Sequence, residues 1–379
     1  MRKFLFIATN DGSSWGGSES LWRKTAERLV ARGSEVCASV PDVGERLKEL
    51  DSLRQAGCQI LAREPLPTLY RLARKVLPLP EQERRHLKLA ANGANLVVIS
   101  QGASTDGIRW MEETGRSSIK YVVIAHTATE FWWPDDSLAR RLAEGYGAAE
   151  AAYFVSQATA ALCRRQFATP LSNARVIRNP FNVRYDAHPQ WPGDSVDDFS
   201  LACVGRLDVG TKGQDLLLEV LSLSHWRDRS IRLSLVGNGV NERVLRHRAE
   251  ELKLTSVEFL GHRSDIEGVW AKHRVMVQPS RQEGMPLGLV EAMLCGRPCV
   301  VTDVGGCKEL VRDDVNGFVA KAPTVELLDE ALSRAWQNRD RLRQMGEQAS
   351  ADVREWVSAN PAEDFAHELE ELADRVATK

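Results

Sequence analysis

Short apolar runs alternate with longer segments of helical periodicity along the first half of the chain. The runs predict buried strands at residues 4–8, 36–40, 57–61, 96–100, 120–125 and 152–155. Between the first two runs, Leu21, Ala26 and Leu29 recur at the spacing of one helix face, and Gly33 suits the end of that helix. Because strands that alternate with helices form parallel sheets, this half predicts a doubly wound α/β domain.

The second half of the chain repeats the same alternation. Apolar runs predict strands at residues 200–204, 231–236, 257–260, 274–278 and 299–302, and helical segments follow at 325–338, 339–351 and 361–377. Residues 186–198 combine prolines, a glycine and acids without periodicity, so we interpret them as the region of the domain boundary. The chain therefore predicts two α/β domains, divided after residue 183.

Length and composition agree with two ordinary globular domains. The chain has 379 residues, of which 43% are hydrophobic and 27% charged, which permits full cores. A formal net charge of −2 gives no field that favours nucleic acid, so we expect no nucleic-acid partner. The seven cysteines form no C-x-x-C pair, which argues against disulfides and zinc and for a reducing compartment. Cys295 and Cys299 are expected in the core.

The sequence contains no candidate for a membrane-spanning helix. The apolar run at residues 4–8 is too short for the hydrophobic part of a signal peptide and passes directly into polar residues. No apolar run approaches the ~20 residues that a membrane helix needs. We expect a soluble or peripheral protein.

A basic stretch between residues 63 and 88 leaves two interpretations open. Its cations, interleaved with leucines and a valine, are Arg71, Arg74, Lys75, Arg84, Arg85 and Lys88. The stretch either forms a basic amphipathic surface that contacts anionic lipid, or a solvated helix pair with an ordinary buried stripe.

Residues 278–291 predict a strand end, a loop and the start of a helix. Pro286 suits the first turn of that helix, so that the N–H groups of Leu287 and Gly288 point outwards and can bind an anion. Glu283 precedes the helix and Glu291 lies in its next turn. An anion-binding site beside two carboxylates could bind a ligand that carries both phosphates and sugar hydroxyls. The alternative is a strand–loop–helix with two solvated glutamates.

The residues after this helix favour the first interpretation. Gly296, Arg297 and Pro298 break the helix, a strand follows at 299–302, and a second glycine turn, Gly305-Gly306, precedes Glu309. The run from Ser280 to Gly317 resembles, without a gap, the donor-binding segment of family-4 glycosyltransferases. That family's pattern has E-G-x-P-L, seven residues between two glutamates, a G-x-P strand and a G-G-x-x-E turn.

The resemblance implies an α/β protein of the GT-B fold, with two Rossmann-like domains that face a central cleft. The acceptor domain would be residues 1–183 and the nucleotide-sugar donor domain 184–359, with the C-terminal helix 360–379 packing back on the first domain. The resemblance also implies a retaining, metal-independent mechanism without a cofactor.

Family patterns assign roles to residues of the second domain. Arg206 and Lys212 lie in a G-R-L…K-G pattern and would clamp the donor diphosphate, whose charge grows as the glycosidic bond breaks. Glu283 would bind sugar hydroxyls and Glu291 the ribose. The remaining donor-binding residues implied by the resemblance are Gly237, Asn238, Arg263, Met285, Pro286, Leu287 and Gly288. Asn238 stands where family members usually carry an acid.

In the first domain, the resemblance draws attention to a glycine pair and a histidine. Gly16 and Gly17 follow the first strand, where the family places a glycine pair near the donor phosphates. His126 ends the strand at 120–125, and the ligand crevice of a doubly wound sheet lies at such strand ends. It would position the donor sugar or the proton in flight. Residues 130–133, Glu-Phe-Trp-Trp, form either an acceptor platform or a hydrophobic anchor for their loop.

The sequence therefore predicts a glycosyltransferase that moves a hexose from a nucleotide sugar to a hydroxyl of a glycan or a lipid-linked acceptor. A UDP-sugar is favoured over GDP-mannose as the donor. We expect a cytoplasmic protein. Of the two interpretations of residues 63–88, the lipid-binding one would place it at the inner face of the membrane. One alternative is a nucleotide-sugar epimerase or hydrolase of the same fold, and another is a binding scaffold with a decayed site. A nicotinamide oxidoreductase is disfavoured because the turn at Gly237 lacks the third glycine of the dinucleotide fingerprint.

Overall fold

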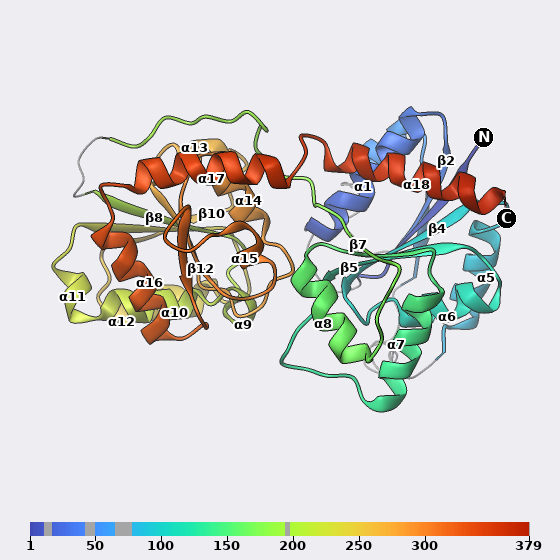
Figure 1. The fold of residues 1–379 in the computed structure, drawn as a ribbon, viewed down its shortest axis with the longest axis horizontal. Helices are drawn as coiled ribbons and strands as arrows, with labels where there is room; N and C mark the ends of the chain where they lie inside the picture. The colour runs from blue at the N-terminus through green and yellow to red at the C-terminus, as the bar shows by residue number, and fades with distance from the viewer. Residues whose placement is uncertain (11–16, 42–49, 65–77, 194–197, 379) are drawn as a thin grey trace. The chain divides into compact units, whose positions relative to one another are not determined.

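A computed structural model describes residues 1–10, 17–41, 50–64, 78–193 and 198–378. The chain divides into two compact units (Figure 1). The first unit comprises Met1–Pro180 together with Asn360–Lys379, and the second comprises Phe181–Ala359.

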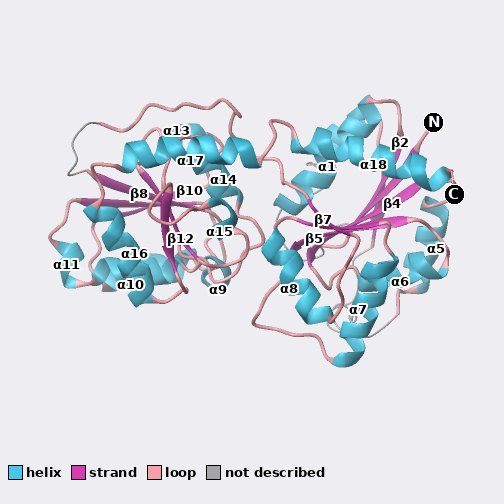
Figure 2. Ribbon diagram, in the orientation of Figure 1, coloured by secondary structure: helices cyan, strands magenta, loops and turns pink. Residues whose placement is uncertain are grey.

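The first unit is built on a seven-stranded parallel sheet in the order β3-β2-β1-β4-β5-β6-β7. Figure 2 distinguishes its strands from the surrounding helices by colour. Its strands are β1 (Lys3–Ala8), β2 (Glu35–Pro41), β3 (Gln59–Arg63), β4 (Leu96–Ala103), β5 (Tyr121–Thr127), β6 (Ala151–Phe154) and β7 (Ala174–Val176). The central strands are buried on both faces and read as continuous apolar runs, as parallel strands between helices do.

Helices cover both faces of this sheet. They are α1 (Gly17–Ala31), α3 (Asp51–Ala56), α5 (Glu81–Ala90), α6 (Ile108–Arg116), α7 (Asp136–Ala148), α8 (Gln157–Phe167) and α18 (Pro361–Ala377). Side chains of α1, α3 and α18 pack with Phe4 and Phe6 of β1, whereas those of α5 to α8 pack with Leu5 and Ile7. The alternation along β1 thus divides the core into two layers.

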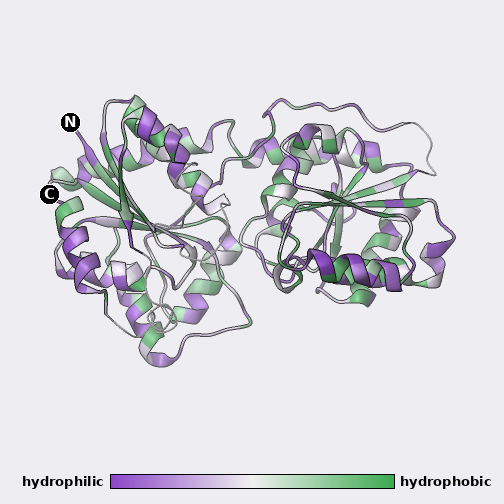
Figure 3. Ribbon diagram, turned by 180° about the vertical axis from the view of Figure 1, so that it is seen from behind, coloured by the Kyte–Doolittle hydropathy of each residue, from purple (hydrophilic) through white to green (hydrophobic). Residues whose placement is uncertain are grey.

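The second unit repeats the design with a six-stranded parallel sheet in the order β10-β9-β8-β11-β12-β13. Its strands are β8 (Phe199–Val204), β9 (Ile231–Val236), β10 (Val257–Gly261), β11 (Val275–Gln278), β12 (Cys299–Thr302) and β13 (Gly317–Ala320). Figure 3 shows hydrophobic residues concentrated along the strands and polar residues on the outer sides of the helices.

The helices of the second unit vary widely in length. They are α9 (Val209–Lys212), α10 (Gln214–Ser222), α11 (Ser224–Arg227), α12 (Glu242–Glu251), α13 (Ile266–Trp270), α14 (Leu287–Leu294), α15 (Cys307–Leu310), α16 (Val325–Gln337) and α17 (Leu342–Trp356). Residues of α10, α12 and α16 share a core cluster with the strands, while α14 packs against β11 and β12 and contacts α17.

Each sheet has one point where the strand order reverses. In the first sheet the chain adds strands outward on one side of β1 and then on the other side, beginning with β4; in the second the same reversal occurs between β8 and β11. Adjacent connections leave the sheet on opposite faces at such a point, which opens a crevice at the carboxyl ends of the two strands. The sequence positions after β8 and β11 are therefore the places to look for a ligand site in the second unit.

Two predictions about segment boundaries are wrong. The region at 186–198, interpreted as the domain boundary, belongs to the second unit, and the division lies between Pro180 and Phe181. Arg274 donates to the carbonyls of Pro192 and Gly193, and Arg297 donates to Gln190, so buried guanidinium groups hold this aperiodic segment. The helix expected at 339–351 begins at Leu342 and extends to Trp356.

The C-terminal helix α18 packs on α1 within the first unit. Phe365 is 1% exposed and meets the ring of Tyr153 edge-on, with centroids 5.0 Å apart. Glu370 accepts hydrogen bonds from Arg2 and Arg32 at 3.0 and 2.9 Å. Both apolar contacts and ion pairs therefore fix the last helix to strands and helices from the start of the chain.

We predict that Phe365→Ala destabilises the first unit by about 3–5 kcal/mol, because a fully buried ring is replaced by a cavity. Chemical denaturation followed by circular dichroism measures this loss. Phe131→Ala serves as the control, since that ring is 73% exposed and its removal should change stability little. Equal effects of the two substitutions would contradict the packing described for α18.

Candidate functional site

The carboxyl end of β8 in the second unit is crossed closely by a neighbouring turn. Gly237, after β9, has φ +135°, and a Cβ atom there would lie 2.1 Å from the carbonyl oxygen of Gly205. Only glycine permits this approach. Beside it, the side chain of Lys212 passes over Gly205, 3.8 Å from where a Cβ of that glycine would lie. The strand end is thus lined by backbone and by one ammonium group.

The short helix α9 delivers Lys212 to this point. Gly213, the residue after the helix, has φ +66°, and a Cβ there would lie 2.0 Å from the carbonyl oxygen of Pro279. The turn after α9 therefore packs directly on the loop after β11. As a result, Nζ of Lys212 lies 2.6 Å from Oε1 of Glu283. The structure brings together two predicted site residues that are separated by 71 positions in sequence.

Glu283 lies in the loop between β11 and α14 and is 9% exposed. Besides Lys212, Gln278 and Ser280 donate to the same carboxylate oxygen, at 2.6 and 2.7 Å. No pattern in the sequence marks these two residues as parts of the site, although both stand in the stretch that carries the strongest motif. A buried carboxylate needs hydrogen-bond donors, and this requirement is the signal that could have drawn attention to them.

Helix α14 begins one residue later than expected. Pro286 has φ −72° and ψ 124° and is the N-cap rather than a residue of the first turn. The prediction about its position is therefore corrected. The first N–H groups of the helix still belong to Leu287 and Gly288, which are partly exposed, whereas Met285 and Pro286 are buried. A helix start leaves such N–H groups without intrahelical partners.

Glu291 lies in α14 and is 3% exposed. Its Oε1 accepts hydrogen bonds from both N and Nδ2 of Asn182, each at 2.9 Å. Asn182 was not predicted as part of the site, because it follows the predicted linker residues and carries no recognisable signal alone. Glu291 therefore also anchors the first residues of the second unit to helix α14.

Arg206 immediately follows Gly205 and is exposed. Its guanidinium group makes no hydrogen bond or ion pair with the residues that the structure describes. Lys212 is neutralised by Glu283, so the two predicted phosphate-binding cations differ. The positive charge of Arg206 is available to a ligand without breaking an existing pair.

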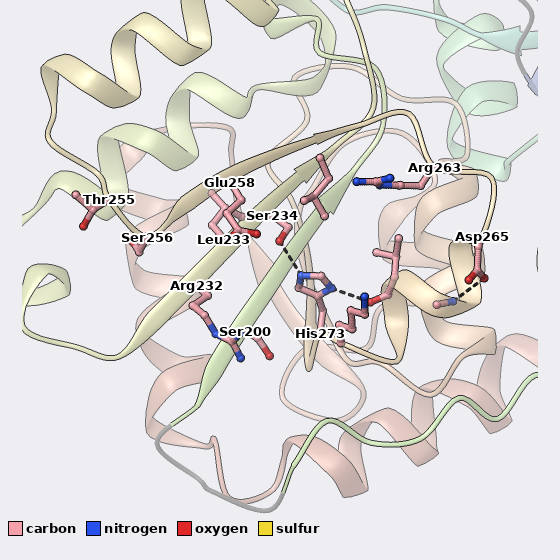
Figure 4. A pocket seen from close by; sticks show the side chains of 14 residues that line it. Ser200, Arg232, Leu233, Ser234, Thr255, Ser256, Glu258, Arg263, Asp265 and His273 are labelled. Carbon is pink, nitrogen blue, oxygen red and sulfur yellow. Dashed lines mark hydrogen bonds between the residues drawn. The ribbon is translucent and has the colours of Figure 1, made fainter.

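Asn238 and Arg263 are exposed at the ends of β9 and β10. Gly237 donates its N–H to Gly261 at 2.8 Å, which places the two turns together. The side chain of Arg263 lines a pocket of about 600 Å³, and residues of β9 and β10 also line it (Figure 4). None of the other residues predicted for the site lines this pocket.

The pocket contains a serine–histidine pair. His273 contacts Ser234 Oγ through Nε2 at 2.8 Å and the carbonyl of Val269 through Nδ1 at 2.7 Å (Figure 4). Ser234 lies within β9, where its backbone N–H serves the sheet. A nucleophilic serine needs nearby hydrogen-bond donors that stabilise the oxyanion of the transition state. We interpret the Ser234–His273 pair instead as a hydrogen-bonded contact of the core.

His126 lies at the end of β5 in the first unit and is 8% exposed. Neither ring nitrogen has a hydrogen-bond partner among the residues described. Burial lowers the pKa of its imidazole from 6.5 to about 3, so the ring is neutral at physiological pH. A buried, neutral imidazole without a partner can donate one hydrogen bond and accept another from a bound molecule.

The remaining predictions for the first unit have mixed outcomes. Gly16 lies outside the described residues, and Gly17 is the first residue of α1. The aromatic rings at 131–133 are exposed, 73%, 41% and 52% respectively, so they do not anchor their loop by burial. Gln166 holds that loop instead, through the carbonyls of Thr129 and Trp132. The acceptor platform stays a prediction.

The basic stretch at 63–88 is only partly described. Residues 65–77, with three of its cations, lie outside the described part of the chain. In α5, Arg84 and Arg85 both pair with Glu81, and Arg63 is buried and donates to Ser39. Within the ranges given above, no helix has both the length and the apolar character needed to cross a bilayer.

Models of two glycosyltransferase families match the two halves of the chain. The model described as Glycosyltransferase Family 4 matches residues 15–185, and the model described as Glycosyl transferases group 1 matches residues 198–338.

The chain belongs to the family-4-like glycosyltransferases of the GT-B fold.

Individual proteins agree with this assignment. An uncharacterized glycosyltransferase of Haemophilus influenzae is 24% identical to this glycosyltransferase over 358 residues, 92% of this chain and 94% of its own. An Escherichia coli enzyme named UDP-Gal:alpha-D-GlcNAc-diphosphoundecaprenol alpha-1,3-galactosyltransferase is 30% identical over 107 residues, 28% of each chain. Two further relatives align over only 45% and 39% of their own length.

The fold of this glycosyltransferase is shared with solved structures. Anabaena Alr3699/HepE in complex with UDP superposes with a TM-score of 0.77 at 19% identity, and the match covers 97% of this chain and 99% of that one. The GT-B architecture expected from the sequence, with two Rossmann-like units, is therefore confirmed.

We predict that His126 makes folding stability fall as the pH is lowered. Its folded pKa, about 3, lies below the ordinary value of 6.5, so between these values the unfolded chain binds more protons than the folded one. The contribution is complete above pH 6.5 and is lost as the pH falls towards 3. Thermal denaturation between pH 7 and 4 should show a smaller decline for His126→Gln than for the wild type.

His262→Gln is the matched control for this measurement, because His262 is exposed. Its stability curve should run parallel to that of the wild type. A His126→Gln curve that is also parallel to the wild type would contradict the burial of a neutral imidazole.

Proposed function

We propose that this glycosyltransferase transfers a hexose from a UDP-sugar, with retention of the anomeric configuration and without a metal ion, and that the second unit holds the donor. The observation that carries the proposal is the arrangement at the strand-order reversal between β8 and β11. There Arg206, the Lys212–Glu283 pair and the start of α14 lie at adjacent strand and helix ends.

The arrangement is suited to a diphosphate leaving group. Breaking the bond between sugar and phosphate leaves an additional negative charge on the phosphate. The guanidinium of Arg206, the ammonium of Lys212 and the N–H groups at the start of α14 would stabilise that charge more in the transition state than in the ground state. Arg206 would contribute without losing an ion pair, because it has none with the described residues.

The two glutamates would bind different hydroxyl groups of the donor. Glu283, beside the ammonium that would hold the phosphate, would accept hydrogen bonds from the sugar. Glu291, in the following helix, would accept from the ribose. Its bonds to Asn182 support this role, because they fix one carboxylate oxygen before a ligand arrives.

The acceptor would bind the first unit. His126 stands at a strand end with two ring nitrogens that lack partners among the described residues, and its neutrality suits it to position a hydroxyl or a sugar oxygen. The exposed rings of Phe131, Trp132 and Trp133 follow the same strand and could stack on sugar faces. We infer a glycan or lipid-linked acceptor, which the name of the E. coli relative supports.

The chemistry would need no metal, because protein cations take its role. The leaving phosphate itself would accept the proton of the incoming hydroxyl on the same face of the sugar, which retains the configuration. The preference for UDP is supported by the UDP complex of the similarly folded HepE.

We predict that UDP raises the melting temperature of the protein more than GDP or ADP at equal concentration, because a ligand that binds only the folded state stabilises it by RT ln(1 + [L]/Kd). Thermal-shift measurements check this order. Arg206→Ala should lose most of the effect of UDP. Arg243→Ala, which removes an exposed arginine of α12, should keep it.

No shift with any nucleotide would count against a donor site and for a scaffold with a decayed site. An equal shift in the Arg206→Ala variant would place the nucleotide elsewhere. Steady release of sugar from the donor without any acceptor would instead favour the hydrolase or epimerase alternative.

We predict that transfer continues at an undiminished rate in the presence of EDTA and yields a product with the anomeric configuration of the donor. The coupling constant of the anomeric proton, measured by NMR on the product, reports the configuration. An inverted product would refute retention, and a large loss of rate with EDTA that added Mg²⁺ restores would refute metal independence.

A further inference from the structure

The two carboxylate oxygens of Glu283 have different surroundings. Oε1 accepts hydrogen bonds from three donors, namely Nζ of Lys212, Nε2 of Gln278 and Oγ of Ser280, at 2.6, 2.6 and 2.7 Å. Oε2 makes no hydrogen bond with the residues that the structure describes. The carboxylate is therefore fixed through one oxygen, and the other remains for a ligand.

Gln278 and Ser280 are held rigidly by the sheet. Gln278 is the last residue of β11 and is 3% exposed, and Ser280 is fully buried. The amide of Gln278 also contacts Ser280 Oγ at 3.2 Å. Thr302, at the end of the neighbouring strand β12, donates to the carbonyl of Ser280 at 2.6 Å. Two paired strands thus set the position of both donors.

The orientation of the Gln278 amide follows from the charge beside it. Its nitrogen faces the Glu283 carboxylate, because an amide oxygen turned the same way would be repelled. Its own oxygen is buried without a partner among the described residues, and it lies 3.8 Å from where a Cβ of Gly288 would be. The orientation in which Gln278 donates to Glu283 therefore leaves its amide oxygen without a hydrogen bond, which is unfavourable in free energy.

Lys212 differs from these two donors. It carries a full charge on a flexible side chain, and in the proposed function its ammonium is attracted to the diphosphate of the donor. When that ammonium turns towards phosphate, its hydrogen bond and ion pair with Glu283 weaken. Gln278 and Ser280 are neutral, belong to the strand end, and gain nothing comparable from a phosphate, so their hydrogen bonds to Glu283 persist.

We propose that Gln278 and Ser280 are positioning residues that keep Oε2 of Glu283 directed at the donor sugar while Lys212 engages the phosphates. The proposal rests on the function proposed above. It implies that these two residues govern the preference for a UDP-sugar over UDP itself, and that they contribute little to the binding of the nucleotide.

The test compares dissociation constants for UDP with those for UDP-glucose, UDP-galactose and UDP-N-acetylglucosamine, measured by calorimetry without an acceptor. The wild type should bind at least one of the sugars more tightly than UDP. Gln278→Met and Ser280→Ala should each weaken binding of that sugar roughly tenfold, the usual worth of a hydrogen bond to a charged group. Binding of UDP should stay within about twofold.

Two further variants separate positioning from general packing. Gln278→Glu keeps the shape but places a like charge beside Glu283, so it should weaken sugar binding more than Gln278→Met. Ser234→Ala removes a buried hydroxyl of strand β9, in the same sheet as Gln278, that contacts His273, and it should leave the ratio between UDP-sugar and UDP unchanged. Circular dichroism verifies that each variant is folded. If Gln278→Met does not fold, Ser280→Ala and Gln278→Glu are sufficient for the test.

Each remaining outcome is decisive. The positioning role would be overturned if the variants kept the wild-type ratio of the two dissociation constants, or if they bound UDP and UDP-sugar equally more weakly. It would also be overturned if the wild type bound the two ligands equally well. A wild type that binds neither UDP nor any of the UDP-sugars would overturn the proposed function instead.

Discussion

Close contact between backbone segments at the carboxyl end of the second sheet is the constraint on which the site depends. At Gly213, Gly237 and Gly305, a Cβ atom would lie 2.0–2.2 Å from a carbonyl oxygen of a neighbouring turn. Side chains are excluded there, so the segments after β8, β9, β11 and β12 approach one another directly. The charged side chains of the site thereby project from a framework of closely packed peptide groups.

The electrostatics of the second unit follow from this framework. Lys212 and Glu283 neutralise each other in a location that is poorly exposed to solvent. Burying either charge there without the other would cost much free energy. Arg206 remains solvated and unpaired among the described residues. The second unit therefore holds one cation in an ion pair and keeps another exposed to solvent at the same strand end.

Much of the fold could be predicted from the sequence, because parallel strands between helices are continuous apolar runs and the helices keep a regular period. The family patterns also named Lys212 and Glu283, whose side chains the structure brings within 2.6 Å of each other. Asn182, Gln278 and Ser280 could not be identified in this way, because their importance depends on which carboxylate they meet in space. The segment at 186–198 misled because it has no periodicity, although buried arginines hold it against the second unit.

All seven cysteines are buried, and burial raises the pKa of every thiol. The native protein should therefore react slowly with maleimides and similar reagents, since these need an accessible thiolate. A cysteine introduced at an exposed position in each unit would consequently be labelled selectively against the natural background. The wild-type chain thus already suits fluorescence or spin-label measurements on either unit, without prior removal of its own thiols.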